Sequence, residues 1–191
     1  MTSFLGLDYA APARIDAIHD EHVTRDLGGR LVTRRIGTAY WRITMAFEPR
    51  AFADALPQLA VHRNAHGQTV PFPMPMPQLS ASAVAGAITV ASAAVAGTTS
   101  VSLASAARIR IPAGHFLTFG GHAKVYQVQA SVDAAAPAEI GIFPELQQAV
   151  EAASPVDAAP NIQVVYESGS GGGWAVDRRN VVSPRIAVVE T

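Results

Sequence analysis

Apolar and polar residues alternate along much of this chain, which is the pattern of strands that bury one face. The clearest stretch runs from Leu31 to Phe47, with an interruption at Gly37. It predicts a half-buried antiparallel pair of strands. We expect the buried face of the second strand to carry Trp41, Ile43, Met45 and Phe47, and the other face to carry Tyr40, Arg42 and Thr44.

A short helix is predicted next, because the spacing of apolar residues changes after Glu48 and Pro49. The residues near one helical stripe are Phe52, Leu56, Leu59 and Arg63. Pro57 lies inside this stretch and should kink or divide the helix, since proline removes a backbone N–H and its ring clashes with the preceding turn. The prolines between residues 71 and 77 then favour an extended segment that follows a surface through Gln78.

The second half of the chain predicts several short strands separated by turns. Gly120 and Gly121 should form a hairpin turn between two of them, and a modest helix or turn is expected over residues 145–153. The predicted strands span residues 87–91, 99–103, 115–119, 122–130, 139–143, 162–166 and 185–190.

Short strands at this spacing indicate a mainly β protein and not βαβ units. We expect a β-sandwich with one short helix, plus a second small portion that is barrel-like or a sandwich. The sandwich is assigned to residues 1–80 and 160–191, and the inserted portion to residues 81–159.

Composition removes several classes of function. The chain has 191 residues, a formal net charge of −1 and 15% charged residues, so it lacks the basic footprint of a nucleic-acid or anionic-membrane binder. It has no cysteine, which excludes disulfides and thiolate catalysis. The first residues lack the pattern of a signal peptide, so export by that route is not expected.

One uncharged stretch is long enough to suggest a membrane span. Residues 79–107 exceed the roughly 20 residues that a helix needs to cross a bilayer. They are mostly Ala, Gly, Ser and Thr, so their transfer into lipid would gain little. We therefore predict short strands here, with a turn at Gly97, and no membrane insertion.

Candidate chemistry is sparse. His19, Asp20, Glu21 and His22 form the densest group of possible metal ligands, but a third ligand at a recognisable spacing is missing and an exposed polar turn is the alternative. The glycine-rich run at 168–173 lacks the lysine of a phosphate-binding loop, so a flexible hairpin tip is expected. The sequence has six histidines and no GxSxG motif. These patterns predict no enzyme activity, no metal and no cofactor.

Two histidines near the predicted hairpin have a weaker possible role. His115 and His122 flank the hairpin and could face each other in a pH-sensitive contact, or could be ordinary polar residues at strand ends. Trp41 is expected in the core, which leaves Trp174 as the candidate platform for a sugar. The arginines at 34, 35, 42 and 50 could pair with carboxylates of an adjacent subunit, or form a solvated face.

Two stretches of sequence carry a family resemblance. Residues 30–75, RLVTRRIGTAYWRITMAFEPRAFADALPQLAVHRNAHGQTVPFPMP, combine a basic strand, a strand with aromatic residues and Trp, a short helix and an extended Phe/Pro segment. Residues 111–150, IPAGHFLTFGGHAKVYQVQASVDAAAPAEIGIFPELQQAV, add a glycine turn, an FxxFG strand and an HxKVYxV strand. Together with the closing RIAVVE strand, they are similar to distal tail proteins of long-tailed, siphovirus-like bacteriophages.

The resemblance implies a structural virion protein without catalysis. Such proteins form a ring, usually of six copies, that joins the tail tube to the tail-tip or baseplate hub. The implied partners are other copies of this chain, the tail tube protein and the hub protein. The implied location is the tail tip, after assembly in the host cytoplasm. Alternatives are another virion joining protein, such as a tail-tube or head–tail connector subunit, and a carbohydrate-binding β-sandwich.

A ring subunit must present two complementary surfaces to its neighbours. We expect the segment Thr69 to Gln78 to reach along or onto a neighbour, because it is uncharged and proline-spaced. The predicted interface residues are Arg34, Arg35, Arg42, Arg50, Val70, Phe72, Met74 and Met76.

Overall fold

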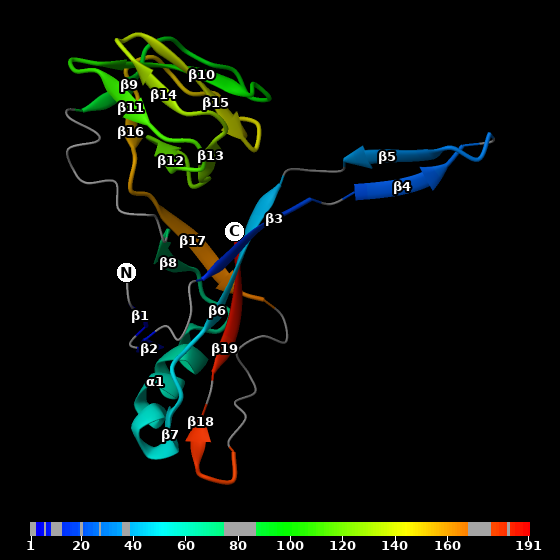
Figure 1. The fold of residues 1–191 in the computed structure, drawn as a ribbon, viewed down its shortest axis with the longest axis vertical. Coiled ribbons are helices and arrows are strands. Elements are labelled where there is room, and N and C mark those ends of the chain that lie inside the picture. Colours follow the sequence, from blue (N-terminus) through cyan, green and yellow to red (C-terminus); the bar gives the residue numbers. More distant parts are fainter. Residues whose placement is uncertain are drawn as a thin grey trace. The chain divides into compact units, whose positions relative to one another are not determined.

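The computed structural model describes residues 3–5, 7–8, 13–19, 21–26, 28–35, 39–74, 87–167, 177–182 and 184–191. Contacts between Cα atoms divide the chain into two units (Figure 1). The first unit consists of Met1–Phe72 and Gln163–Thr191, and the second of Pro73–Ile162. The boundaries predicted from the sequence, at residues 80 and 160, differ from these by eight residues at the first boundary and by three at the second.

The first unit is built on one five-stranded sheet. Its strand order is β3 (Arg14–Ile18), β6 (Tyr40–Ala46), β19 (Arg185–Glu190), β17 (Asn161–Tyr166) and β8 (Val70–Pro73). Three two-stranded pairs accompany it: β1 (Ser3–Phe4) with β2 (Leu7–Asp8), β4 (Glu21–Arg25) with β5 (Leu31–Arg35), and β7 (Arg50–Ala51) with β18 (Val181–Val182).

Strand β6, the second of the five, confirms the alternation expected from the sequence. Trp41, Ile43 and Met45 are buried, and so is Phe47, which lies just beyond the strand. Tyr40, Arg42 and Thr44 on the other face are partly exposed. Because β6 pairs with both β3 and β19, it is an interior strand with a hydrogen-bonded neighbour on each side.

The helix differs from its prediction. Helix α1 (Phe52–Ala65) follows β7 and runs without a break through Pro57. The N–H that Pro57 lacks would have bonded to the carbonyl of Ala53. Both residues are exposed, so water can satisfy that carbonyl and the helix continues. The predicted stripe is also wrong, because the buried residues of α1 are Ala55 and His62, while Leu56 is exposed.

Strand β8 occupies an edge of the five-stranded sheet, beside β17. An edge tolerates Pro71 and Pro73, because a proline has no N–H to donate to a further strand. Phe72 and Met74 are buried within the chain, and the Met74 N–H donates to the carbonyl of Pro160 (3.2 Å). The part of the proline segment that the structure describes is therefore packed on the protein's own body.

The second unit is a closed barrel of six antiparallel strands. Its strands are β9 (Ile88–Val90), β10 (Ser100–Ser105), β12 (Phe116–Phe119), β13 (Tyr126–Val128), β15 (Ala138–Phe143) and β16 (Pro155–Asp157), in the order β10-β15-β13-β12-β16-β9. Strands β11 (Ile109–Ile111) and β14 (Val132–Ala134) form a separate pair. The predicted hairpin around Gly120 and Gly121 is confirmed as β12 and β13.

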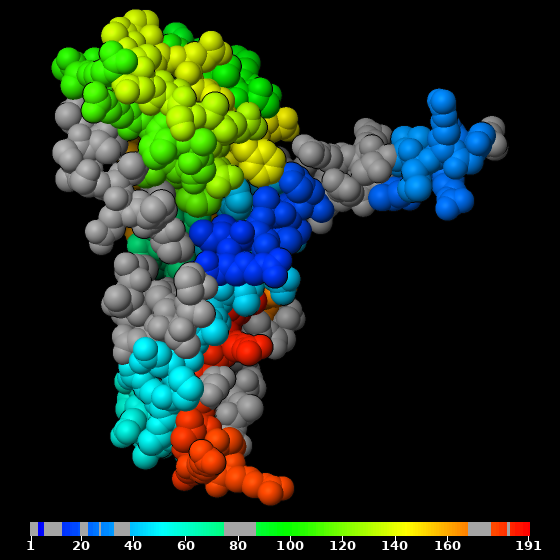
Figure 2. Space-filling view, viewed as in Figure 1, coloured from blue at the N-terminus to red at the C-terminus, as the bar shows by residue number. Residues whose placement is uncertain are grey.

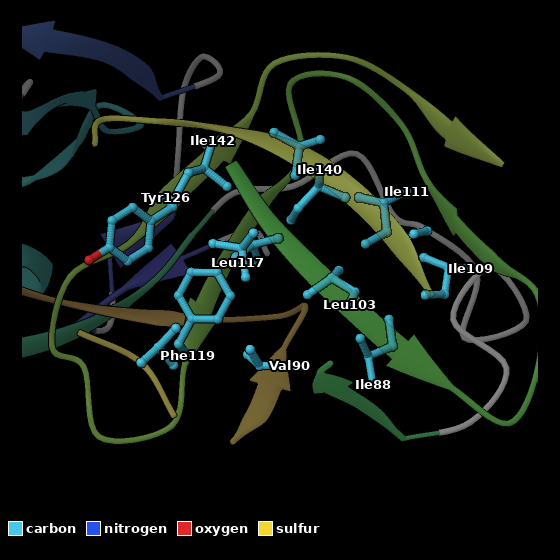
Figure 3. Close-up of a cluster of buried hydrophobic side chains, with 14 of the residues drawn as sticks. Ile88, Val90, Leu103, Ile109, Ile111, Leu117, Phe119, Tyr126, Ile140 and Ile142 are labelled. Atoms are coloured by element: carbon cyan, nitrogen blue, oxygen red, sulfur yellow. The ribbon is translucent and has the colours of Figure 1, made fainter. Parts of the chain in front are cut away.

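Side chains fill the inside of the barrel (Figure 3). Leu103, Leu117, Tyr126, Ile140 and Ile142 are fully buried, and their side chains point toward one another from four strands, β10, β12, β13 and β15. Burial alternates along β10 and β15, so every second residue of these strands lines the interior. At Gly120 the barrel wall is so close that an added Cβ would lie 2.7 Å from the ring of Pro155.

These observations confirm a mainly β fold with one helix and a second, barrel portion. In residues 145–153 the structure has an isolated bridge between Ala94 and Val150 and no helix. In the described part of the stretch 79–107, residues 87–107, strands β9 and β10 are found. Among the described residues, no helix is both long enough and apolar enough to cross a membrane.

Candidate subunit interface

The hairpin of β4 and β5 continues a ladder that begins in the five-stranded sheet. Strand β3 pairs with β6 up to Ile18 and Tyr40, and β4 pairs with β5 from Glu21 and Arg35 onward. Two residues separate β3 from β4, and four residues separate β5 from β6. The two ladders therefore differ in register by two residues. Among the described strands, β4 and β5 pair only with each other.

Asp26 fixes the turn of this hairpin. Its carboxylate accepts hydrogen bonds from the N–H groups of Gly28 (2.9 Å) and Arg30 (2.8 Å). Gly29 has a φ of 79°, a left-handed conformation that glycine adopts without strain. The same arrangement recurs before β18, where Asp177 accepts from two N–H groups and Asn180 has a φ of 63°.

Both faces of this hairpin carry exposed apolar side chains. Directly opposed residues share a face, so Val23, Arg25 and Leu31 lie on one face and Val32 on the other. The exposed fractions are 52% for Val23, 64% for Leu31 and 47% for Val32. Figure 2 shows the described strands of the hairpin in light blue, open on the face in view.

Helix α1 has a second exposed apolar face. Leu56 and Val61 are exposed on it, together with the smaller residues Ala53, Pro57 and Ala60. Asp54 and Arg63 are exposed on the same helix, so the charges of this region balance. The sequence pattern did not reveal this face, because the helix is apolar on both sides.

The predicted interface arginines have different surroundings. Arg42 pairs with Glu167 of its own chain (2.6 Å), so its carboxylate partner is internal to the chain. Arg50 lies in β7 opposite Val182, and it already interacts with another group of its own chain. Arg34 and Arg35 belong to β5, and their side chains lie outside the described part of the structure.

The predicted apolar interface residues are mostly internal. Phe72 and Met74 are buried in the chain's own fold, which removes them from a surface that a neighbour could cover. Val70 is partly exposed at the edge of the sheet, and Met76 lies outside the described residues. An uncharged, proline-rich segment suggests a surface that a neighbouring subunit covers. The edge of a sheet accepts such a segment equally well, so Phe72 and Met74 are buried within their own chain.

An aromatic cluster in the first unit was not predicted. His62 of α1 is buried among Phe4, Phe47 and Tyr166, with ring centroids 5.9 to 6.0 Å away. The Tyr166 hydroxyl hydrogen-bonds to Nδ1 of His62. Burial lowers the pKa of His62 to about 4, although a hydrogen bond to the backbone of Phe4 opposes the shift. Burial also raises the pKa of Tyr166. Both groups are therefore neutral at pH 7.

His115 and His122 do not face each other across their hairpin. Nε2 of His115 lies 2.8 Å from the carbonyl of Ala158, and burial lowers the pKa of this histidine. His122 contacts the hydroxyl of Tyr126 through Nδ1 (3.2 Å). That hydroxyl also accepts a hydrogen bond from the N–H of Gln147 (3.1 Å). The two histidines are separate polar contacts of the barrel, which corrects the interpretation as a histidine pair.

The other candidate sites receive no support from the described residues. Among these residues, no group of three or more histidine, cysteine, aspartate or glutamate side chains could hold a metal ion. Asp20 and the glycine-rich run at 168–173 lie outside the described part. Trp41 is 4% exposed, so a sugar could not stack on it. Trp174 lies outside the described residues. No model of a known protein family matches the chain, and no curated protein shows significant similarity to it.

Proposed function

We propose that this protein is a structural virion protein that forms a ring of six copies at the distal end of a siphovirus-like phage tail. The ring joins the tail tube to the tail-tip or baseplate hub. The observation that carries the proposal is the β4–β5 hairpin, which exposes Val23, Leu31 and Val32 and pairs with no other described strand.

A hairpin of this kind is poorly stable by itself. Two strands that bury neither face are marginally stable in water, because the packing of side chains does not offset the entropy lost on ordering the backbone. Exposed apolar side chains on both faces add a tendency to associate. The hairpin therefore has the properties of a segment that is ordered by contact with another molecule.

Ring assembly requires surfaces of this sort. A head-to-tail contact closes into a ring when each subunit presents two different, complementary surfaces. The chain offers the hairpin and the exposed face of α1 with Leu56 and Val61, besides the surface of the barrel. The resemblance of residues 30–75 and 111–150 to distal tail proteins supplies the location in the tail.

One stretch departs from the pattern of the family that the sequence resembles. Gly37, Thr38 and Ala39 stand where that family usually has Gly-Gly before the aromatic-Trp strand.

The test is the mass of the purified protein by light scattering, followed by negative-stain imaging. We expect a closed ring of about six copies, and we expect Leu31→Asp to dissociate it, because an acid placed in an apolar contact is strongly unfavourable. Leu56→Asp places the same acid on the exposed face of α1, so the two variants compare the hairpin with the helix as the contact. A ring that survives Leu31→Asp would exclude the hairpin as the contact, and a protein that never associates, alone or with tail tube protein, would refute the proposed function.

A further inference from the structure

The barrel has an exposed surface where two of its loops lie side by side. Residues 92–98 and 144–153 form it, and we refer to it as the barrel-end surface. The backbones of Ala94 and Val150 exchange two hydrogen bonds of 2.9 Å, and the Gly97 N–H donates to the carbonyl of Leu146 (2.7 Å). These bonds fix the two loops to each other.

The side chains that point outward from this surface are apolar in the middle. Val150 is buried, so its neighbours in the antiparallel bridge, Ala149 and Glu151, face solvent. The register places Val95 across from Ala149 and Ala93 across from Glu151. Val95 is 68% exposed, the largest fraction among the described large apolar side chains.

The charge of the barrel-end surface is wholly negative. Its two loops contain Glu145 and Glu151 and no lysine or arginine, a net charge of −2. Both glutamates are exposed, and within the described residues neither has an ion-pair partner. By contrast, Asp133 on the β11–β14 pair is neutralised by Arg108 and Arg110.

The β4–β5 hairpin has the opposite charge. Residues 21–35 hold four arginines against two acids, a net charge of +2 with His22 neutral. On one face, Arg25 lies opposite Leu31 and two residues from Val23, so a basic group borders exposed apolar side chains. Arg30 in the turn is also exposed.

We propose that the β4–β5 hairpin of one copy docks on the barrel-end surface of the next copy. Val23 and Leu31 cover Val95 and its alanine neighbours, and Arg25 and Arg30 pair with Glu145 and Glu151. The proposal rests on the proposed ring function and names the two surfaces that would meet in it. The exposed face of α1 is a weaker match for the hairpin, because Asp54 and Arg63 leave it without net charge.

The test uses two charge-reversed variants. In Glu145→Arg/Glu151→Arg the barrel-end surface becomes basic, and in Arg25→Glu/Arg30→Glu the hairpin becomes acidic. Each variant alone brings like charges together at every contact, so we expect self-association at least about tenfold weaker than in the wild type. Sedimentation or light scattering over a concentration series measures this.

Mixing the two variants restores opposite charges. The basic hairpin of the first variant then meets the acidic barrel end of the second, and the acidic hairpin of the second meets the basic barrel end of the first. We expect an equimolar mixture to recover association close to that of the wild type, with alternating copies. Combining all four substitutions in one chain should also recover it.

Matched controls reverse the same number of exposed charges elsewhere. Glu48→Arg/Glu139→Arg and Arg178→Glu/Arg179→Glu change no residue of the two surfaces, and we expect them to associate like the wild type. Raising the salt concentration should weaken wild-type association more than that of the charge-reversed variants, since the ion pairs are at an exposed rim.

Three results would overturn the inference. Unchanged association of the charge-reversed variants shows that rings form through other surfaces, and leaves the proposed function standing. Failure of the mixture to recover association, when the fourfold variant does recover it, places the contact within one chain. A wild-type chain that remains monomeric at millimolar concentration removes the contact between copies, and the proposed function is then decided separately by association with tail tube protein.

Discussion

Because His62 is buried, we expect acid to lower the free energy of unfolding of the first unit, by an amount that follows from the pKa of His62. In the unfolded chain the imidazole has an ordinary pKa of 6.5, and in the folded chain burial lowers this pKa to about 4. Between these two pH values the unfolded state binds a proton that the folded state does not. The stabilisation that comes from keeping His62 neutral is therefore fully present above pH 6.5. It decreases as the pH falls below 6.5 and is lost once the pH has passed through 4. This difference between the two pKa values corresponds to about 3 kcal/mol of the free energy of unfolding.

Urea unfolding followed by tryptophan fluorescence can measure this effect. The only tryptophans, Trp41 and Trp174, belong to the first unit, so fluorescence reports that unit and not the barrel. We expect the free energy of unfolding to fall between pH 7 and pH 4, and to fall about 3 kcal/mol less in His62→Phe/Tyr166→Phe. This double variant removes both members of the His62–Tyr166 hydrogen bond, so neither side chain is left without the other. The backbone of Phe4 does lose its hydrogen bond to His62.

The comparison of wild type and double variant isolates His62 from other acid-sensitive groups. Every ionisable group other than His62 and Tyr166 is the same in the two proteins, so its response to acid cancels in the comparison. Equal losses of stability in the two proteins would refute the reasoning, because they would show that His62 is protonated in the folded state without penalty.

Three further predictions concern packing and backbone conformation. Gly120→Ala should destabilise the barrel by about 1–3 kcal/mol, because its Cβ would meet the ring of Pro155; near-ultraviolet circular dichroism during thermal unfolding reports this through the tyrosine of the barrel core. Asn180→Gly should stabilise the first unit and Asn180→Ala should destabilise it, each by about 1 kcal/mol or less, because the φ of 63° favours glycine; urea midpoints measured by tryptophan fluorescence check the sign. Ile140→Ala should cost about 2–5 kcal/mol of barrel stability while leaving the tryptophan-detected transition in place, and coincident loss of both transitions would contradict two separately packed units.

Alternation predicted the strands well where one face is buried. The sequence pattern assigned β6 with its buried face, because a period of two is visible there. It also placed a strand at β19, where burial does not alternate and no buried face was assigned. The pairing of strands into a closed barrel was less accessible, since closure depends on the pairing of β9 with β16, which are remote from each other in the chain.

The candidate interface could not be predicted in the same way. Val23 lies between polar residues just as many core residues do, and Leu31 is followed by a second apolar residue, Val32. Only the absence of a covering element among the described residues distinguishes them from core residues. His62 was missed for a related reason. Its neighbours Phe4, Phe47 and Tyr166 come from three distant segments, and nothing in the local sequence around α1 indicates that they meet.

The hydrogen bond between Met74 and Pro160 has a consequence for how such a gene can change. The chain leaves the first unit after β8 and returns to it in β17, and these two strands are neighbours in one sheet. A coding segment for the residues between them could be shortened, lost or exchanged by recombination while both ends still meet at the same place. An insertion or deletion between β8 and β17 would therefore leave the strand order of the five-stranded sheet unchanged.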